Sequence, residues 1–161
     1  DQFSTGGAKL AAEIGAISAD HLEASSEEDL IALKLAGVIP VVLPGASLGL
    51  GIDFAPARRI LDLDLPLVIA SDFNPGSAPM GELLTQASLM SVYEKLSMAE
   101  TLAAITSRAA KALEFSMRGI LSEGYLADIN IFSIEDFREI LYSQGRIKPS
   151  QVIKEGIKVE F

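Results

Sequence analysis

A single aspartate, Asp72, stands where a buried strand is predicted to give way to a loop. It follows the apolar run at 67–70 and one serine, and it opens the polar sequence Asp-Phe-Asn-Pro-Gly. A carboxylate at the end of an apolar strand is costly to bury unless it is paired, hydrogen-bonded or bound to a metal ion. Asp72 is therefore a candidate active-site residue and metal ligand. The structural alternative is that it caps the turn at 74–76.

The one histidine of the chain, His21, also follows a short apolar stretch. Imidazole can act as a metal ligand or exchange a proton near neutral pH, although a lone histidine at a strand end is more often structural. The carboxyl ends of parallel strands meet at one edge, where barrel enzymes hold their active sites. We therefore expect His21 and Asp72 at the ends of neighbouring strands, with their side chains facing one cavity.

The loop after Asp72 offers three further groups for binding a small molecule. Asn74 carries an amide, Gly76 allows a close approach of the backbone, and Ser77 carries a hydroxyl. Such groups suit an acidic or amide substrate, although turn formation alone explains the Pro-Gly pair equally well. Because Asn74 lies two residues past the candidate ligand, we expect its amide to reach only the organic substrate.

Helices and strands alternate along the first two thirds of the chain. Such alternation is needed if His21 and Asp72 are to share one edge of a parallel sheet, because parallel strands are joined by crossover helices. Hydrophobic spacing and turn residues predict strands at 16–21, 38–43 and 67–70, with a glycine-rich loop to Ile52 after the second strand. Helices are predicted from Gly6, from Ser25 or Ser26 to Gly37, at 56–63, after Pro79, and from Ser97 to Leu113. The last helix has a capping box (Ser97 with Glu100) and a break near Thr106. The βαβα pattern indicates an α/β fold with a parallel sheet. Three strands are too few for an eight-stranded barrel, so we expect the C-terminal half of a TIM-like (β/α)₈ barrel.

After residue 117 the pattern changes to short strands and turns, at 119–121, 124–132, 152–153 and 157–159, with one amphipathic helix near 135–142. We place a domain boundary there. Residues 1–117 are expected to form the half-barrel, and residues 118–161 a small β-rich segment.

Composition excludes several classes of partner. Thirteen Lys and Arg against twenty-two Asp and Glu leave a net charge of −9, which repels nucleic acid and anionic membrane surfaces. The absence of cysteine excludes disulfides and thiolate metal sites and favours a cytoplasmic protein. The uncharged stretch 35–52 is long enough to consider as a membrane span, but Pro40 and Pro44 interrupt it, so we interpret it as a buried strand followed by a loop. The glycine-rich loop at 45–51 does not contain the lysine of a phosphate-binding loop, which excludes nucleotide binding there.

Several motifs together resemble one enzyme family. They are Gly-Gly-Ala-Lys-Leu-Ala-Ala-Glu at 6–13, Ser-Ala-Asp-His-Leu-Glu at 18–23, Leu-Pro-Gly-Ala at 43–46, Ser-Asp-Phe-Asn-Pro-Gly-Ser at 71–77 and Gly-Ile-Leu-Ser-Glu-Gly-Tyr-Leu-Ala-Asp-Ile at 119–129. On these residues the chain is similar to the imidazolonepropionases of the amidohydrolase superfamily over essentially its whole length. The last motif resembles the return of that superfamily into its composite β domain.

The resemblance implies a barrel that holds one zinc or iron ion. That ion activates water to open the ring of 4-imidazolone-5-propanoate, giving N-formimino-L-glutamate in histidine catabolism. Asp72 matches the aspartate ligand, and His21 matches a histidine that touches the metal-bound water or the substrate carbonyl. Asn74, Gly76 and Ser77 match substrate contacts. Gln2 matches a pocket residue three places after a ligand histidine that lies outside this chain.

The chain departs from the family pattern in lacking the His-x-His pair and the third ligand histidine. It starts with neither an initiator methionine nor a signal region, so we expect a fragment that is inactive alone and that can lack the metal. Its apolar strands must pack against other elements on both faces of the sheet, and the chain is not expected to supply those elements. We therefore expect it with its missing N-terminal half, as a homodimer through the open sheet, or aggregated. The alternatives are another amidohydrolase, such as a cyclic amidase or deaminase, and a non-catalytic assembly module.

Overall fold

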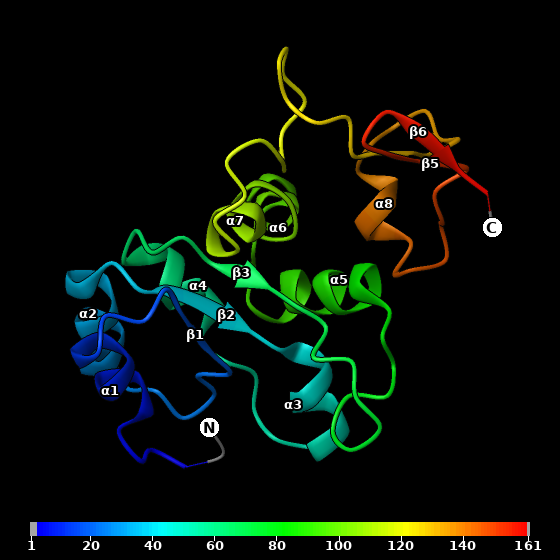
Figure 1. Ribbon diagram of the computed structural model, residues 1–161. Coiled ribbons are helices and arrows are strands. Elements are labelled where there is room, and N and C mark those ends of the chain that lie inside the picture. The colour runs from blue at the N-terminus through cyan, green and yellow to red at the C-terminus, as the bar shows by residue number, and fades with distance from the viewer. Residues whose placement is uncertain (1–2, 161) are drawn as a thin grey trace.

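The computed structural model describes residues 3–160, which form a three-stranded parallel sheet with helices on its faces and a separate three-stranded antiparallel sheet (Figure 1). The elements follow in the order α1 (Gly7–Glu13), β1 (Ser18–Asp20), α2 (Glu27–Ala36), β2 (Ile39–Val42), α3 (Pro44–Leu50), α4 (Ala57–Asp62), β3 (Val68–Ile69), α5 (Leu83–Tyr93), α6 (Met98–Ala104), α7 (Ser107–Ala112), β4 (Ile129–Ile131), α8 (Glu139–Tyr142), β5 (Gln151–Lys154) and β6 (Ile157–Val159).

The parallel sheet has the order β1-β2-β3, which confirms the predicted βαβ alternation. Ser18 pairs with Ile39, and Val41 pairs with Val68, so the three strands run side by side in the same direction. All three therefore end at one edge, and the loops that follow them gather there.

Local sequence signals account for the ends of the helices. In α2 the Ser26 hydroxyl accepts from the backbone N–H of Asp29 at 3.2 Å, and the Asp29 carboxylate accepts from the N–H of Ser26 at 2.8 Å. The backbone hydrogen bond from Ser26 is the main cause that lowers the pKa of Asp29. At the other end Gly37 adopts a left-handed φ of 73°, which glycine takes without steric cost.

Both faces of the parallel sheet are covered within the chain. One face packs Val42 and Ile69 against Leu33, Ile60 and other side chains from the helices. The alternate positions Ile39, Val41 and Val68 face the other way and contact Ala109 and Ala112 of α7, which lies across the sheet from α2 in Figure 1. The expectation that the chain does not supply cover for both faces was wrong, because helices pack on one face and α7 folds back over the other.

The predicted glycine-rich loop at 45–52 differs in conformation. Most of it belongs to the helix α3, with Pro44 at the first position and Gly51 as the left-handed cap. The uncharged run 35–52 thus divides between the end of α2, β2 and α3. Among residues 3–160 no helix combines the length and apolar character needed to cross a membrane.

Helix α1 forms where it was predicted, but its large apolar side chains point outward. Ala8 is buried, whereas Leu10 is 57% exposed, and Ile14 and Ile17, which follow the last helical residue, are 70% and 51% exposed. The alanine face of the helix packs on the core, because small side chains allow close packing against α2. An apolar surface is left without cover from the described residues.

The C-terminal segment is antiparallel. β5 pairs with β4 on one side and with β6 on the other, through a tight turn in which Glu155 and Gly156 both have positive φ. Helix α8 is shorter than predicted and docks on α5, where the Ser88 hydroxyl donates to the Leu141 carbonyl at 2.6 Å. The predicted strand at 119–121 is wrong, because residues 119–120 form a bend and residue 121 is irregular.

Candidate active site

His21 and Asp72 lie at the same edge of the parallel sheet. His21 follows β1 directly, and Asp72 comes three residues after β3. The shared edge confirms part of the prediction, but the strands are not neighbours, because β2 lies between them. Adjacent strands lie about 4.8 Å apart, so β1 and β3 are separated by roughly 10 Å. That distance leaves room for a small molecule between the two side chains.

The backbone is left-handed at both strand ends. His21, Leu22 and Asp72 have φ values of 74°, 73° and 48°. The other non-glycine residues with positive φ follow helices or turn a hairpin: Asp64, Lys95, Glu114, Gln144 and Glu155. Capping does not explain the three at the strand ends, and a left-handed leucine is sterically disfavoured. Tertiary packing holds that turn, since Leu22 is buried in the main core.

The ring of His21 is oriented by a buried acid. Its Nδ1 lies 3.2 Å from Oε1 of Glu23, whose side chain is only 5% exposed. Because a carboxylate only accepts, Nδ1 carries the proton and Nε2 of the neutral ring is left as an acceptor. No other described residue bonds to this ring. Carboxylates orient histidines in this way at metal and catalytic sites, so Glu23 is a functional candidate that the sequence reasoning missed.

The Asp72 carboxylate is held by one of its two oxygens. Oδ2 accepts from Nδ2 of Asn74 at 3.1 Å and from the Ser77 hydroxyl at 3.4 Å. Nδ2 also donates to the backbone carbonyl of Asp72 at 2.6 Å. No described residue donates to Oδ1. The loop therefore fixes the carboxylate and leaves one oxygen open for a ligand.

The amide of Asn74 is occupied inside its own loop. Its Oδ1 accepts from the backbone N–H groups of Gly76 and Ser77, both at 2.9 Å. A Cβ at Gly76 would lie 3.2 Å from this oxygen, which favours glycine there. The expectation that Asn74 reaches only an organic substrate was wrong, because its amide bonds the Asp72 carboxylate directly. Substrate contacts by Asn74, Gly76 and Ser77 stay predictions.

A metal ion fits this edge only in part. Asp72 Oδ1 is a suitable hard donor, and the Nε2 atom of His21 is open. However, residues 3–160 contain no group of three His, Asp or Glu side chains close enough to hold an ion. A catalytic zinc ion takes about three protein ligands. Further ligands must therefore come from outside these residues, and Gln2, the remaining predicted site residue, also lies outside the described part.

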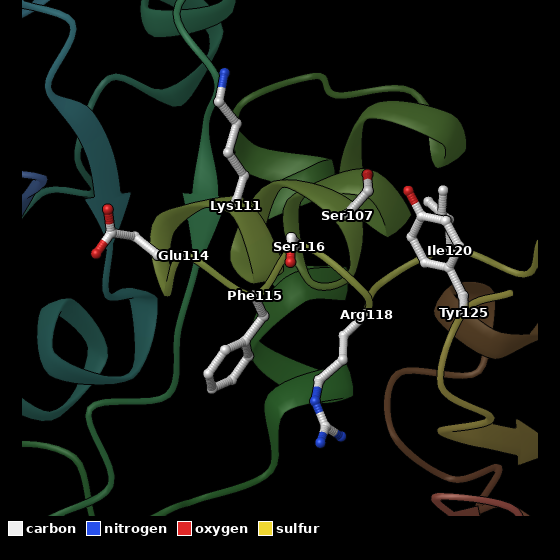
Figure 2. A pocket seen from close by; sticks show the side chains of 8 residues that line it. All are labelled: Ser107, Lys111, Glu114, Phe115, Ser116, Arg118, Ile120 and Tyr125. Carbon is white, nitrogen blue, oxygen red and sulfur yellow. The ribbon is translucent and has the colours of Figure 1, made fainter.

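A separate cavity of about 440 Å³ lies beside α7 and is lined by Ser107, Lys111, Glu114, Phe115, Ser116, Arg118, Ile120 and Tyr125 (Figure 2). The charged ends of Lys111, Glu114 and Arg118 point away from one another in Figure 2. Arg118 is also engaged by Asp128 and by Glu155. The cavity lacks a convergent set of polar groups, so it is not the candidate site.

Comparison with known proteins matches the chain to one family. The model of the Amidohydrolase family covers residues 11–156. The chain is 43% identical over 152 residues to the imidazolonepropionase of Geobacillus thermodenitrificans, covering 94% of this chain and 36% of that protein. It is 39% identical over 160 residues to the imidazolonepropionase of Deinococcus radiodurans, covering 99% of this chain and 40% of that protein. The chain thus spans well under half the length of these relatives.

Solved structures share the fold at low sequence identity. An adenosine deaminase from Xanthomonas campestris with bound zinc superimposes with a TM-score of 0.81 at 20% identity, over 98% of this chain and 43% of that one. An atrazine chlorohydrolase from Arthrobacter aurescens in complex with zinc gives a TM-score of 0.74 at 19% identity, over 96% of this chain and 42% of that one.

Proposed function

Because the chain belongs to the amidohydrolase family, we propose that it supplies the C-terminal half of the barrel of an imidazolonepropionase-like enzyme. We call the longer protein, in which this chain is joined to an N-terminal half-barrel, the intact enzyme. It opens the ring of 4-imidazolone-5-propanoate with water and yields N-formimino-L-glutamate. Identities of 39–43% to curated imidazolonepropionases over nearly the whole chain support this choice of substrate.

The observation that carries the proposal is that His21 and Asp72 lie at the same sheet edge, each held by hydrogen bonds through one atom with a second atom open for a ligand. Asp72 is fixed through Oδ2 and offers Oδ1. His21 is fixed through Nδ1 and offers Nε2. Their strands are separated by one strand, which suits a flat five-membered ring and an attacking water lying between them.

Each residue then has a role in one hydrolytic step. Asp72 would hold a zinc or iron ion through Oδ1, and that ion would lower the pKa of water from about 16 toward about 7 and polarise the ring carbonyl. The Asp72 carboxylate takes up the proton of the attacking water. The water oxygen bonds to the ring carbonyl carbon, the adjacent C–N bond breaks, and the proton passes to the leaving nitrogen. His21 accepts from the water through Nε2, or donates to the carbonyl oxygen when Nε2 carries a proton. The 74–77 loop and Gln2 hold the substrate.

The remaining half of the barrel is the proposed partner of this chain. It would cover the exposed apolar surface of Leu10, Ile14 and Ile17 and add the ligand histidines. The length of the relatives supports this occupant over a homodimer, because about three fifths of each relative has no counterpart here. Residues 1–117 belong to this barrel and 118–161 to its composite β domain. The intact enzyme is expected in the cytoplasm.

A second candidate is a deaminase, favoured by the TM-score of 0.81 to an adenosine deaminase. That likeness concerns the fold, whereas the run Asn-Pro-Gly-Ser at 74–77, one of the motifs that carry the imidazolonepropionase resemblance, argues against a deaminase. Assaying the intact enzyme, loaded with zinc or iron, on 4-imidazolone-5-propanoate and on adenosine separates the two. Turnover of the imidazolone alone is expected. Turnover of adenosine, or of neither compound by a metal-loaded enzyme, would overturn the proposed function.

A further inference from the structure

The side chain of Gln86, on α5, is a fully buried polar group that joins two of the loops at the active edge. It has no exposed surface. Its Oε1 accepts from the backbone N–H of Gly45 at 3.0 Å, and its Nε2 donates to the carbonyl of Ser71 at 3.3 Å. Gly45 is the second residue of α3, which follows β2, and Ser71 directly precedes Asp72. Gln86 therefore links the ends of β2 and β3 through one amide.

The packing around this amide leaves little freedom. A Cβ added at Gly45 would lie 2.7 Å from Oε1 of Gln86, so only glycine allows this approach. Further along α3, a Cβ added at Gly49 would lie 1.8 Å from the carbonyl oxygen of Ser77. Helix α3 therefore contacts both Gln86 and the far end of the 71–77 loop, so the loop is held at its two ends.

We propose that Gln86 is a positioning residue for catalysis, which sets the orientation of the Asp72 carboxylate by holding Ser71 against α3. The inference rests on the proposed function of Asp72. The mechanical link is short, because the carbonyl that Gln86 binds belongs to the residue before Asp72. Asp72 itself has a left-handed φ of 48°, a conformation that needs support from its surroundings.

A residue of the same helix provides a matched control. Ser88 is also buried, at 3% exposure, and its hydroxyl donates to the Leu141 carbonyl at 2.6 Å. Its partner belongs to α8, in the C-terminal segment, and not to the active edge. Loss of the Ser88 hydrogen bond or of the two Gln86 hydrogen bonds should lower the melting temperature, but only loss of the Gln86 bonds should disturb Asp72.

The test compares Gln86→Met and Ser88→Ala in the metal-loaded intact enzyme. Gln86→Met keeps the length of the side chain and removes both hydrogen bonds. We expect it to lower kcat by about 10-fold or more while KM changes by less than about 3-fold, and Ser88→Ala to leave kcat within about 2-fold. Amide hydrogen exchange in residues 71–77 should rise in Gln86→Met and stay unchanged in Ser88→Ala.

Gln86→Glu adds a readout that a purely structural role would not produce. Burial raises the pKa of a carboxyl group, and the protonated form can both accept from Gly45 and donate to Ser71. Activity should therefore recover as the pH is lowered, which neither the parent enzyme nor Gln86→Met should show. A pH-independent loss in Gln86→Glu would contradict the donor role.

Two results would overturn the inference: a kcat for Gln86→Met within 2-fold of the parent, or equal loop exchange in Gln86→Met and Ser88→Ala. Failure of the proposed function is recognised separately. If the parent enzyme does not turn over the imidazolone, the function falls, while hydrogen exchange and zinc content per subunit still decide whether Gln86 holds the Asp72 loop.

Discussion

The two regions of the chain are stabilised by different interactions. Among the described residues, the buried apolar side chains lie before residue 117 with one exception, Leu141, which packs back onto the core of the first region. The C-terminal segment is instead held by charges. Asp128 accepts from Lys154 at 2.7 Å and from the backbone of Glu155 at 2.8 Å, and Arg118 bridges Asp128 and Glu155.

This difference matches the demands on each region. Apolar packing is dense and insensitive to salt, so it can hold His21 and Asp72 in place although their backbones are left-handed. Exposed ion pairs contribute little stability and are screened by salt. The first region is therefore expected to carry the chemistry, and the second to respond to pH and ionic strength.

The largest expected contrast is between two aspartates, one in each region. In the intact enzyme Asp72→Asn should lower kcat by roughly 10²–10⁴-fold, because it removes a proton acceptor and a ligand charge. Asp128→Asn, which is isosteric in the same way, should leave kcat within about 2-fold. Steady-state rates at full metal occupancy check both. Equal losses in the two variants would show that the C-terminal segment takes part in catalysis.

Truncation of an isoleucine to alanine should lower the free energy of unfolding much more in the first region than in the second. Ile60 is completely buried, so Ile60→Ala should lower the free energy of unfolding by about 2–5 kcal/mol. Ile157, in β6, is 73% exposed, and Ile157→Ala should cost less than about 0.5 kcal/mol. Denaturant unfolding of the intact enzyme measures both. A large effect at Ile157 would mean that this strand is covered in the intact enzyme.

Within the first region, Asn74→Ala tests the support of Asp72. The variant removes the hydrogen bond to Oδ2 and leaves the backbone N–H groups of Gly76 and Ser77 without their acceptor. Loss of such support typically weakens metal affinity by about 10–100-fold. Zinc titration against a competing chelator measures this. Unchanged zinc affinity with a raised KM would restore the view that Asn74 acts on the substrate alone.

The smallest effect concerns the charges of the second region. The Lys154 ammonium, the Glu155 N–H and Arg118 hold the pKa of Asp128 at about 2, below the ordinary 3.8. Since the folded pKa is lowered, the stabilisation is fully present above pH 3.8 and is lost as the pH falls through about 2. The backbone amide signal of Glu155 in NMR spectra should therefore titrate near pH 2 and lose this transition in Asp128→Asn. A midpoint near 3.8 would mean that these contacts do not persist in solution.

Local sequence signals predicted the elements well. The helix start at Ser26, the capping box at Ser97 and the break near Thr106 all appear in the structure. These features depend on hydrogen bonds between residues three or four positions apart, so a short window of sequence contains both partners. The helix at 44–50 was missed because its glycines favour a loop, and packing against Ser77 and Gln86 overrides that preference.

The sequence by itself determined that His21 and Asp72 follow strands of a parallel sheet, because an apolar segment and the polar residues that end it are neighbours in the sequence. Only the tertiary structure decided that β2 separates them, since strand order depends on which surfaces bury together. The same holds for Gln86, whose partners lie 41 and 15 positions away. Glu23 lies two residues from His21, yet the acid acquires its role only because the left-handed turn at 21–22 and the burial of Leu22 bring its carboxylate against the ring.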